Sequence, residues 1–203
     1  ALCEIIAALH HPDGSVAVDG FYDRVRPIDE KERTAMAKTD VSDEEWKRLT
    51  GAPQAWGEAQ YTLRERVGAR PTLEVNGIWG GFTGEGSKTV LPAKATAKIS
   101  CRLVPDQDPY EIEALIRAQV AKLAPPTITW EVRALNHGHC ALVPIDSLAM
   151  ECAVAAYERG FGARPLFLRE GGSIPVVATF SQTYNVPVLL VGYGLPDDGA
   201  HGP

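Results

Sequence analysis

The chain has 203 residues, of which 45% are hydrophobic, and it carries a formal net charge of -6. It is therefore long and apolar enough to be a globular protein that buries a core. Its acidity and the absence of a Lys/Arg cluster exclude a nucleic-acid-binding surface, and no stretch approaches the roughly 18 apolar residues of a membrane helix.

The first segments are predicted to be helical. Apolar residues at helical spacing predict a helix over residues 1–10, which starts without Met and without the basic segment of a signal peptide. We therefore expect the chain to begin inside a longer protein. Residues 28–66 are charged and helix-prone, and Asp40, Ser42 or Asp43 is positioned to cap a helix there. These residues are expected to form a helical insertion.

Two strands joined by a glycine-rich turn are expected next. Residues 71–79 alternate in the manner of a strand, and a longer strand is predicted from Thr89 to about Val104. Alternate residues of the longer strand form an apolar face and a polar face, and Arg102 belongs to the polar face. A bulge near Pro92 would bring Thr89 and Arg102 together, because proline cannot join the hydrogen-bonded ladder.

A helix and another strand complete this first unit. The Pro/Asp-rich segment 105–109 ends the long strand and caps a helix that stops at Pro125, and residues 127–133 are predicted to be a strand. With one further strand supplied before Ala1, the order of elements is βαββαβ. We predict a split βαβ domain over residues 1–137, in which helices cover one face of a four-stranded antiparallel sheet.

Residues 138–203 have a different character and predict part of a mostly parallel α/β domain. The predicted elements are a helix from about Ile145 to Tyr157 that Asp146 or Ser147 caps, a short strand at 165–168, a helix from Pro175 to about Tyr184, and a buried strand at 186–191. The predicted fold class of the whole chain is therefore α/β.

The four cysteines are Cys3, Cys101, Cys140 and Cys152, and all have apolar neighbours. None belongs to a Cys-x-x-Cys pair, so we expect buried, reduced thiols in a cytoplasmic protein. A disulfide or a catalytic thiol is the alternative interpretation.

Two segments have residues suited to binding an anion. The junction from Arg169 to Pro175 contains two glycines that let backbone amides approach a ligand, and a helix N-terminus favours negative charge. Ser173 either contributes to that site or only caps the helix. Arg102 is suited to a bidentate grip on a carboxylate, although an arginine on a solvated sheet face is the simpler interpretation.

Three histidines are candidates for metal binding or substrate contact. His137 and His139 are two residues apart, so on an extended segment they project to the same side, either as a metal pair or as polar residues of a hinge. His201 follows an apolar run and a Gly/Pro/Asp loop. A zinc site needs three or more protein ligands, and no further ligand pattern is present in this sequence.

Taken together, four motifs resemble the dizinc peptidase family of carnosinase-like dipeptidases, aminoacylase, succinyl-diaminopimelate desuccinylase and glutamate carboxypeptidase. The motifs are Gly84–Pro92, Ile99–Pro109, Arg169–Pro175 and Gly199–His201. The helical insertion and the segment Leu73–Gly81 are most similar to the bacterial carnosinase-like branch.

The resemblance implies a lid domain over residues 1–137 that also forms a homodimer, followed by the C-terminal part of a catalytic domain over residues 138–203. It implies that substrate is bound by Thr89, Arg102, Gly172, Ser173 and His137, with His139 as the competing choice for the hinge histidine. His201 would be the last ligand of a site for two divalent ions, zinc or alternatively manganese or cobalt.

The other metal ligands and the general base of that family precede the lid, so the resemblance implies that no catalytic residue lies in this sequence. We expect the intact protein to be a cytoplasmic, metal-dependent dipeptidase or exopeptidase that cleaves peptide or N-acyl-amino-acid amide bonds, and this chain alone to be inactive. Two alternatives remain: a non-catalytic dimerisation or small-peptide-binding module, and an anion-binding α/β protein without a metal.

Overall fold

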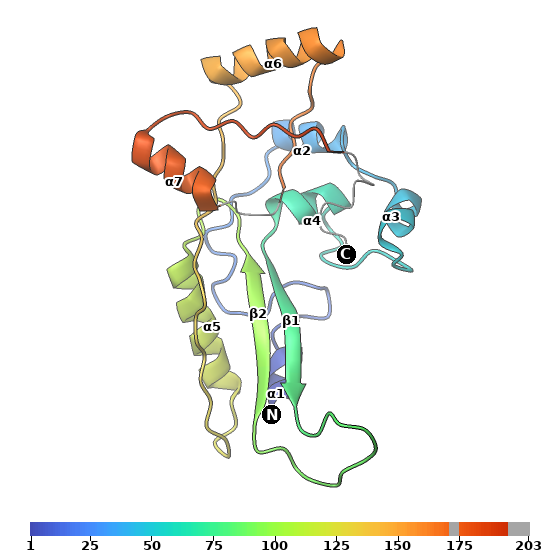
Figure 1. Ribbon diagram of the computed structural model, residues 1–203, viewed down its shortest axis with the longest axis vertical. Coiled ribbons are helices and arrows are strands. Elements are labelled where there is room, and N and C mark those ends of the chain that lie inside the picture. The colour runs from blue at the N-terminus through green and yellow to red at the C-terminus, as the bar shows by residue number, and fades with distance from the viewer. Residues whose placement is uncertain (171–174, 195–203) are drawn as a thin grey trace.

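The computed structural model describes residues 1–170 and 175–194 (Figure 1). Its helices are α1 (Leu2–Ala7), α2 (Glu30–Ala37), α3 (Asp43–Thr50), α4 (Leu63–Ala69), α5 (Pro109–Leu123), α6 (Leu148–Phe161) and α7 (Pro175–Tyr184). Its strands are β1 (Thr72–Gly80) and β2 (Ala95–Arg102). The α/β class is confirmed, because helices and an antiparallel sheet occur in one chain.

Local capping residues set where the helices begin. Ser42 accepts a hydrogen bond from the Glu45 amide at the start of α3, and Ser147 accepts one from the Met150 amide at the start of α6. Asp108 accepts hydrogen bonds from two backbone amides at the start of α5. These side chains satisfy amides that have no partner inside the helix, so the predicted helix starts are confirmed where such a cap exists.

The two strands form an antiparallel hairpin with one irregularity. Thr72 pairs with Arg102 at one end and Gly80 with Ala95 at the other, and the register shifts between Val75 and Gly77. The bulge therefore lies at Asn76 on β1, and the bulge predicted near Pro92 is wrong. The second strand also starts later than predicted, so Thr89 lies in the loop of residues 81–94.

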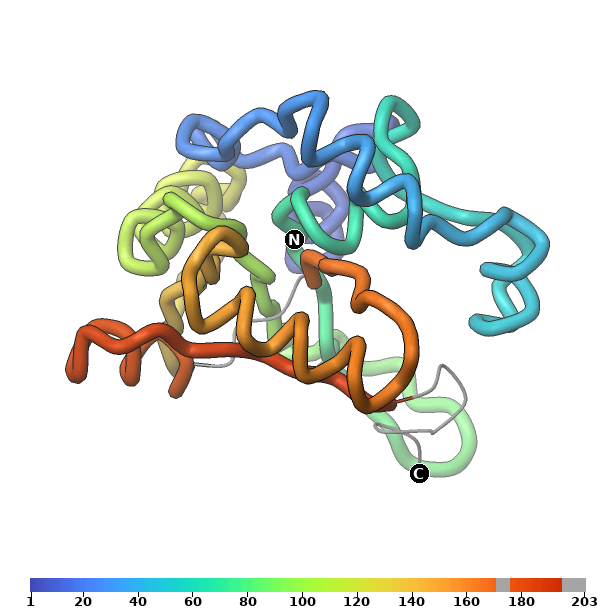
Figure 2. Tube along the Cα trace, turned by 90° about the horizontal axis from the view of Figure 1, so that it is seen from above, coloured from blue at the N-terminus to red at the C-terminus, as the bar shows by residue number. Residues whose placement is uncertain are grey.

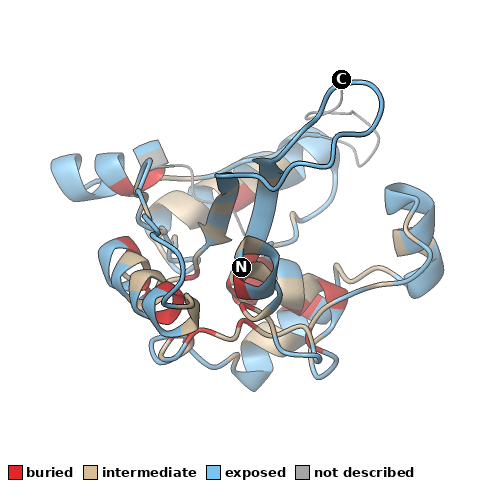
Figure 3. Cartoon of the chain, turned by 90° about the horizontal axis from the view of Figure 1, so that it is seen from below, coloured by how far each residue is buried: buried red, intermediate tan, exposed pale blue. Residues whose placement is uncertain are grey.

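One face of the hairpin packs against helices. A buried cluster joins the segment after α1 to β1 and α5, and its members are Leu9, Val16, Val18, Phe21, Leu73 and Ile112. On β2, Ala97, Ile99 and Cys101 are half-buried while the residues between them are exposed. This alternation confirms the predicted apolar and polar faces. Figure 3 shows the buried residues gathered around α1 and α5, with the hairpin loop exposed.

Three predicted strands are wrong: residues 127–133, 165–168 and 186–191 are not strands in the described chain. A strand needs a neighbouring ladder of backbone hydrogen bonds. Residues 127–133 run along α5 instead, where the Val132 carbonyl accepts a hydrogen bond from the Arg117 side chain. The described part of the sheet consequently has two strands, where three of the four strands predicted for the first domain were expected within this chain.

The C-terminal described segment lies beside α6. The Tyr157 hydroxyl donates a hydrogen bond to the Gly192 carbonyl over 2.9 Å, and the Tyr157 and Tyr193 rings stack with centroids 5.6 Å apart. Figure 2 shows this segment running along α6. Most side chains of residues 186–194 are exposed. The apolar run that predicted a buried strand is therefore not buried in the described structure.

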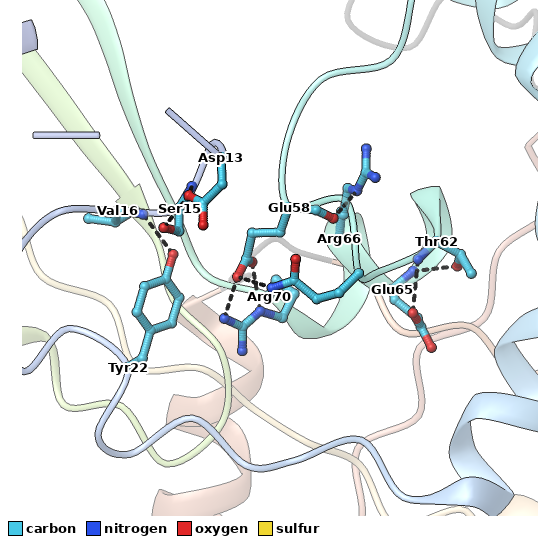
Figure 4. Close-up of polar contacts among 10 residues, drawn as sticks. Asp13, Ser15, Val16, Tyr22, Glu58, Thr62, Glu65, Arg66 and Arg70 are labelled. Atoms are coloured by element: carbon cyan, nitrogen blue, oxygen red, sulfur yellow. Dashed lines mark hydrogen bonds and ion pairs between the residues drawn. The ribbon is translucent and has the colours of Figure 1, made fainter. Parts of the chain in front are cut away.

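A largely shielded arginine, Arg70, fixes the segment before β1 to the core. Arg70 donates to both carboxylate oxygens of Glu58 over 2.7 Å (Figure 4). Its guanidinium lies 4.6 Å from the centre of the Tyr22 ring and 4.5 Å from that of the Tyr61 ring. The Tyr22 hydroxyl in turn accepts a hydrogen bond from the Val16 amide. Paired charges and aromatic contacts together compensate for burying this guanidinium.

The cysteine prediction is partly wrong. All four thiols are free, but Cys3 and Cys152 are exposed, whereas Cys101 and Cys140 are half-buried. Burial, with a smaller contribution from the Glu74 carboxylate, raises the pKa of Cys101 to about 12. Within residues 1–170 and 175–194, no helix is long and apolar enough to cross a membrane.

Candidate substrate-binding site

Arg102 is the last residue of β2 and lies on the exposed face of the hairpin. Its strand partner is Thr72, the first residue of β1. Figure 1 shows that the end of β2, the start of β1 and the start of α5 lie at the same end of the hairpin. This end is called the α5 end below, and the loop of residues 81–94 forms the opposite, loop end.

Thr89 lies far from Arg102. Seven residue steps separate Ala95 from Arg102 in the register, which is roughly 23 Å at about 3.3 Å per residue, and Thr89 lies beyond Ala95 in the loop. A regular β2 without a bulge keeps this separation. The expectation that a bulge joins Thr89 and Arg102 is therefore wrong within one chain.

His137 is held against α5. Its Nε2 atom lies 2.7 Å from Oε2 of Glu113, and its ring stacks on Tyr110 with centroids 4.2 Å apart and an interplanar angle of 22°. His139 is exposed, and its ring centroid is 6.3 Å from that of Tyr110. The two histidines thus have different surroundings although they are two residues apart.

Further contacts bring the His137 segment to the α5 end. The Cys140 thiol donates to the Leu103 carbonyl over 3.0 Å, next to Arg102, and the Val132 carbonyl binds Arg117 of α5. Arg117 also donates to Glu113 over 2.7 Å. Hydrogen bonds from Arg117 and, second, from His137 hold the pKa of Glu113 below its usual value. The structure therefore gathers Arg102 and His137 at one end of the hairpin.

Arg169 reaches the same region from the C-terminal part of the chain. Its guanidinium forms an ion pair with Glu32 of α2, and its carbonyl packs against Gly68 of α4, where a Cβ would overlap it. Gly68 is four residues before Thr72, the partner of Arg102. The predicted residues Gly172 and Ser173 lie outside the described residues.

Metal ligands are not gathered in the described chain. Residues 1–170 and 175–194 contain no group of three or more His, Cys, Asp or Glu side chains that could hold a metal ion. The predicted ligand His201 lies outside the described residues. The donors within the described residues do not fit a two-metal centre.

Sequence reasoning missed Glu113, Tyr110 and Glu32. Tyr110, Glu113 and Arg117 are spaced by three and four residues, which places them on one face of α5. That spacing could have revealed a polar face. Nothing local indicates that this face binds a histidine 24 residues later, or that Glu32 binds Arg169.

A shallow hollow beneath α6 is separate from these residues. Its lining includes Ile145, Val154 and Phe167, and it contains none of the predicted site residues. The candidate site at the α5 end thus lies apart from this hollow.

The chain is similar to known proteins in sequence and in fold. The family model of the peptidase dimerisation domain matches residues 1–128. The Cys-Gly metallodipeptidase of Schizosaccharomyces pombe is 35% identical over 204 residues, covering 98% of this chain and 43% of that protein. This chain thus spans about two fifths of the length of that relative.

Two solved structures share the arrangement of both parts of the chain. The dipeptidase Dug1p from Saccharomyces cerevisiae superposes with a TM-score of 0.84 at 31% identity, over 98% of this chain and 42% of that one. Human carnosine dipeptidase 1 superposes with a TM-score of 0.85 at 25% identity, over 98% of this chain and 43% of that one.

Proposed function

Because the chain belongs to the M20 peptidase dimerisation domain family, we propose that it supplies dimer contacts and substrate-binding groups to a metal-dependent dipeptidase. The substrate class is a dipeptide or an N-acyl-amino acid. The observation that carries the proposal is the gathering of Arg102 and His137 at the α5 end. We place the boundary between the lid and the catalytic part near residue 137.

Arg102 binds the C-terminal carboxylate of the substrate in this proposal. It lies on an exposed strand face, where a planar guanidinium can hold both carboxylate oxygens. His137 contacts the substrate from the adjacent hinge segment, and Gly172 and Ser173 contribute from the loop that follows Arg169. His137 is favoured over His139 because its ring is fixed by two contacts to α5.

In this proposal, Thr89 contributes to the substrate-binding site of the other subunit of the homodimer. A dipeptide backbone spans about 7 Å, which is far less than the distance between the two ends of the hairpin. Thr89 and Arg102 of one chain therefore cannot bind the same substrate molecule. We propose that the loop end extends to the partner, where Thr89 joins Arg102 of the partner subunit.

The metal proposal concerns two divalent ions, zinc in the first instance and manganese or cobalt as alternatives, with His201 as one ligand. The proposed compartment is the cytoplasm, which suits four free thiols. Metal analysis of the intact protein tests the first point: about two ions per subunit are expected, and none would favour the non-catalytic module.

Mixed dimers test the function and the dimer geometry together. Chains of the intact protein carrying Thr89→Ala and Arg102→Ala are co-expressed with different tags, and the heterodimer is purified. One site then has both wild-type residues and the other has neither, so about half of the wild-type activity is expected. If both residues act within one subunit, the heterodimer is as impaired as the two single variants.

The metal requirement is tested separately. A chelator should abolish the activity of the intact protein, and added zinc should restore it.

A further inference from the structure

The imidazole of His137 is fixed from two directions. Glu113 of α5 binds its Nε2 atom over 2.7 Å, and the Tyr110 ring stacks on it with an interplanar angle of 22°. Both contacts come from one helix, three residues apart. The His137 and Glu113 side chains are 21% and 23% exposed, so the pair is partly shielded from water.

The charge of Glu113 decides which ring nitrogen carries the hydrogen. Arg117 pairs with Oε1 of Glu113 over 2.6 Å, while His137 contacts Oε2. An ionised carboxylate can only accept hydrogen bonds. The hydrogen shared by the pair must therefore reside on Nε2, and the neutral ring has an unprotonated Nδ1.

The remaining ring nitrogen is not completely buried. Among the described residues, no hydrogen bond reaches Nδ1 of His137. Nδ1 is also not one of the fully buried side-chain atoms that lack a hydrogen-bond partner. Nδ1 therefore keeps some exposed surface on a side chain that is 21% exposed, and it is the ring nitrogen left for a ligand. Nε2 is occupied by Glu113 and is not available to a substrate.

We propose that Glu113 is a positioning residue that acts through His137: it holds the imidazole in the Nε2-protonated form, so that the ring presents Nδ1 to the substrate. This inference rests on the proposed function, because it assumes that His137 contacts the substrate. Beyond the proposed function, it identifies Glu113 as the group that orients His137 and Nδ1 as the ring atom that faces the substrate. A hydrogen-bonded carboxylate commonly fixes the tautomer of a functional histidine in this way.

His139 is the matched control within the same segment. It is exposed, and no hydrogen bond to its ring is present in the described chain. Glu111 is the matched control on the helix: it lies two residues before Glu113 and pairs with Arg24 over 2.7 Å. Neither residue contacts His137 in the described structure, so their substitution leaves the pair intact.

Nitrogen-15 spectra of the intact protein with labelled histidine measure the tautomer directly. His137→Gln and His139→Gln assign the two signals, and the spectra are recorded at a pH where the rings are neutral. We expect His137 to be in the Nε2-protonated form and to become a mixture of tautomers in Glu113→Gln. Glu111→Gln should change nothing. A wild-type His137 ring with hydrogen on Nδ1, or no change in Glu113→Gln, overturns the inference.

Kinetics of the intact enzyme test whether the orientation matters to substrate. Glu113→Ala should raise KM about tenfold, the size of one lost hydrogen bond, with a smaller effect on kcat. In a His137→Ala background, Glu113→Ala should add nothing, because Glu113 acts through that ring. Glu111→Ala should retain wild-type KM, and circular dichroism of each variant confirms folding.

Multiplicative effects of Glu113→Ala and His137→Ala, or an unchanged KM in Glu113→Ala, overturn the positioning role. An intact protein that cleaves no dipeptide with metal present instead overturns the proposed function and, with it, the substrate contact of His137. The two failures are distinguishable, because the first is seen in a variant of an active enzyme and the second in the wild type.

Discussion

Glu32 and Arg169 form an ion pair although 137 residues separate them in the sequence. The pair joins α2 of the helical insertion to the segment that enters the Arg169–Pro175 motif, and the side chains are only 25% and 16% exposed. The insertion therefore contacts the part of the chain that precedes the predicted substrate-binding glycines. The helical insertion thus helps to hold the segment that leads into the Arg169–Pro175 motif.

Removing this pair should loosen the attachment of α2. We expect Glu32→Gln to lower the free energy of unfolding by about 1 kcal/mol, as for a partly buried charged hydrogen bond. Amide hydrogen exchange should become faster in α2 and near residue 169. Glu30→Gln, an exposed position on the same helix, is the control. Equal exchange in the two variants would show that the pair contributes nothing.

Gly68→Ala should destabilise the folded chain, although alanine has a higher helix propensity than glycine. The new Cβ would overlap the carbonyl of Arg169, and backbone cannot move as easily as a side chain. We expect a loss of about 1–3 kcal/mol, typical of overpacking, measured by urea unfolding. Gly160→Ala in α6, where nothing lies near the added methyl group, is the control and should be neutral or stabilising.

The Glu58–Arg70 pair should be sensitive to the loss of one partner. Both side chains are largely buried, at 8% and 13% exposure. Glu58→Gln leaves the guanidinium without its charged partner between two tyrosine rings, so a loss of about 3 kcal/mol is expected. Arg48→Gln, which removes an exposed pair with Glu45, should cost less than about 1 kcal/mol. Thermal unfolding of both variants makes the comparison, and equal effects would contradict it.

Arg102→Ala should weaken substrate binding by about 2–5 kcal/mol, the range for losing one partner of a charged pair. The measurement is KM of the intact enzyme for a dipeptide with a free carboxylate and for its C-terminal amide. The variant should lose the preference for the free carboxylate. Lys98→Ala, on the same exposed face of β2, is the control. A retained preference in Arg102→Ala would rule out the carboxylate contact.

Thiol reactivity should differ among the cysteines. Burial raises the pKa of Cys101 to about 12, so its thiolate is scarce at pH 8 and increases only as the pH approaches 12. We expect iodoacetamide to modify the exposed Cys3 and Cys152 in the folded protein at pH 8 and to leave Cys101 unmodified until denaturant is added. Mass spectrometry of peptides gives the outcome. Rapid modification of native Cys101 would mean that the strand opens.

Helices with a clear local cap were predictable from the sequence. Ser42, Asp108 and Ser147 each satisfy amides within their own first turn, so their effect depends on neighbours a few residues away. Strands were less predictable, because an apolar run such as 186–191 forms a strand only beside another strand. The pairing partner is a property of the fold, and periodicity alone does not supply it.

The same difference between local and tertiary information applies to the candidate site. Arg102 could be selected from its residue type and its place on the polar face of a strand, and the structure keeps it on the exposed face. The separation of Thr89 from Arg102 depends on where β2 begins, which the proline-containing loop determines. Spacing alone did not separate His137 from His139, and the resemblance made His137 the first choice. In the structure, contacts with α5 distinguish the surroundings of the two rings.

By itself, the sequence determined the α/β class, the helix caps, the alternating faces of β2 and the family resemblance, because these follow from spacing and residue type along the chain. Only the tertiary structure decided that Glu113 holds His137, that Glu32 holds Arg169, and that Thr89 and Arg102 lie at opposite ends of one hairpin. The physical reason is that these relationships depend on distances through space, which are fixed when the helices and the hairpin pack around a common core.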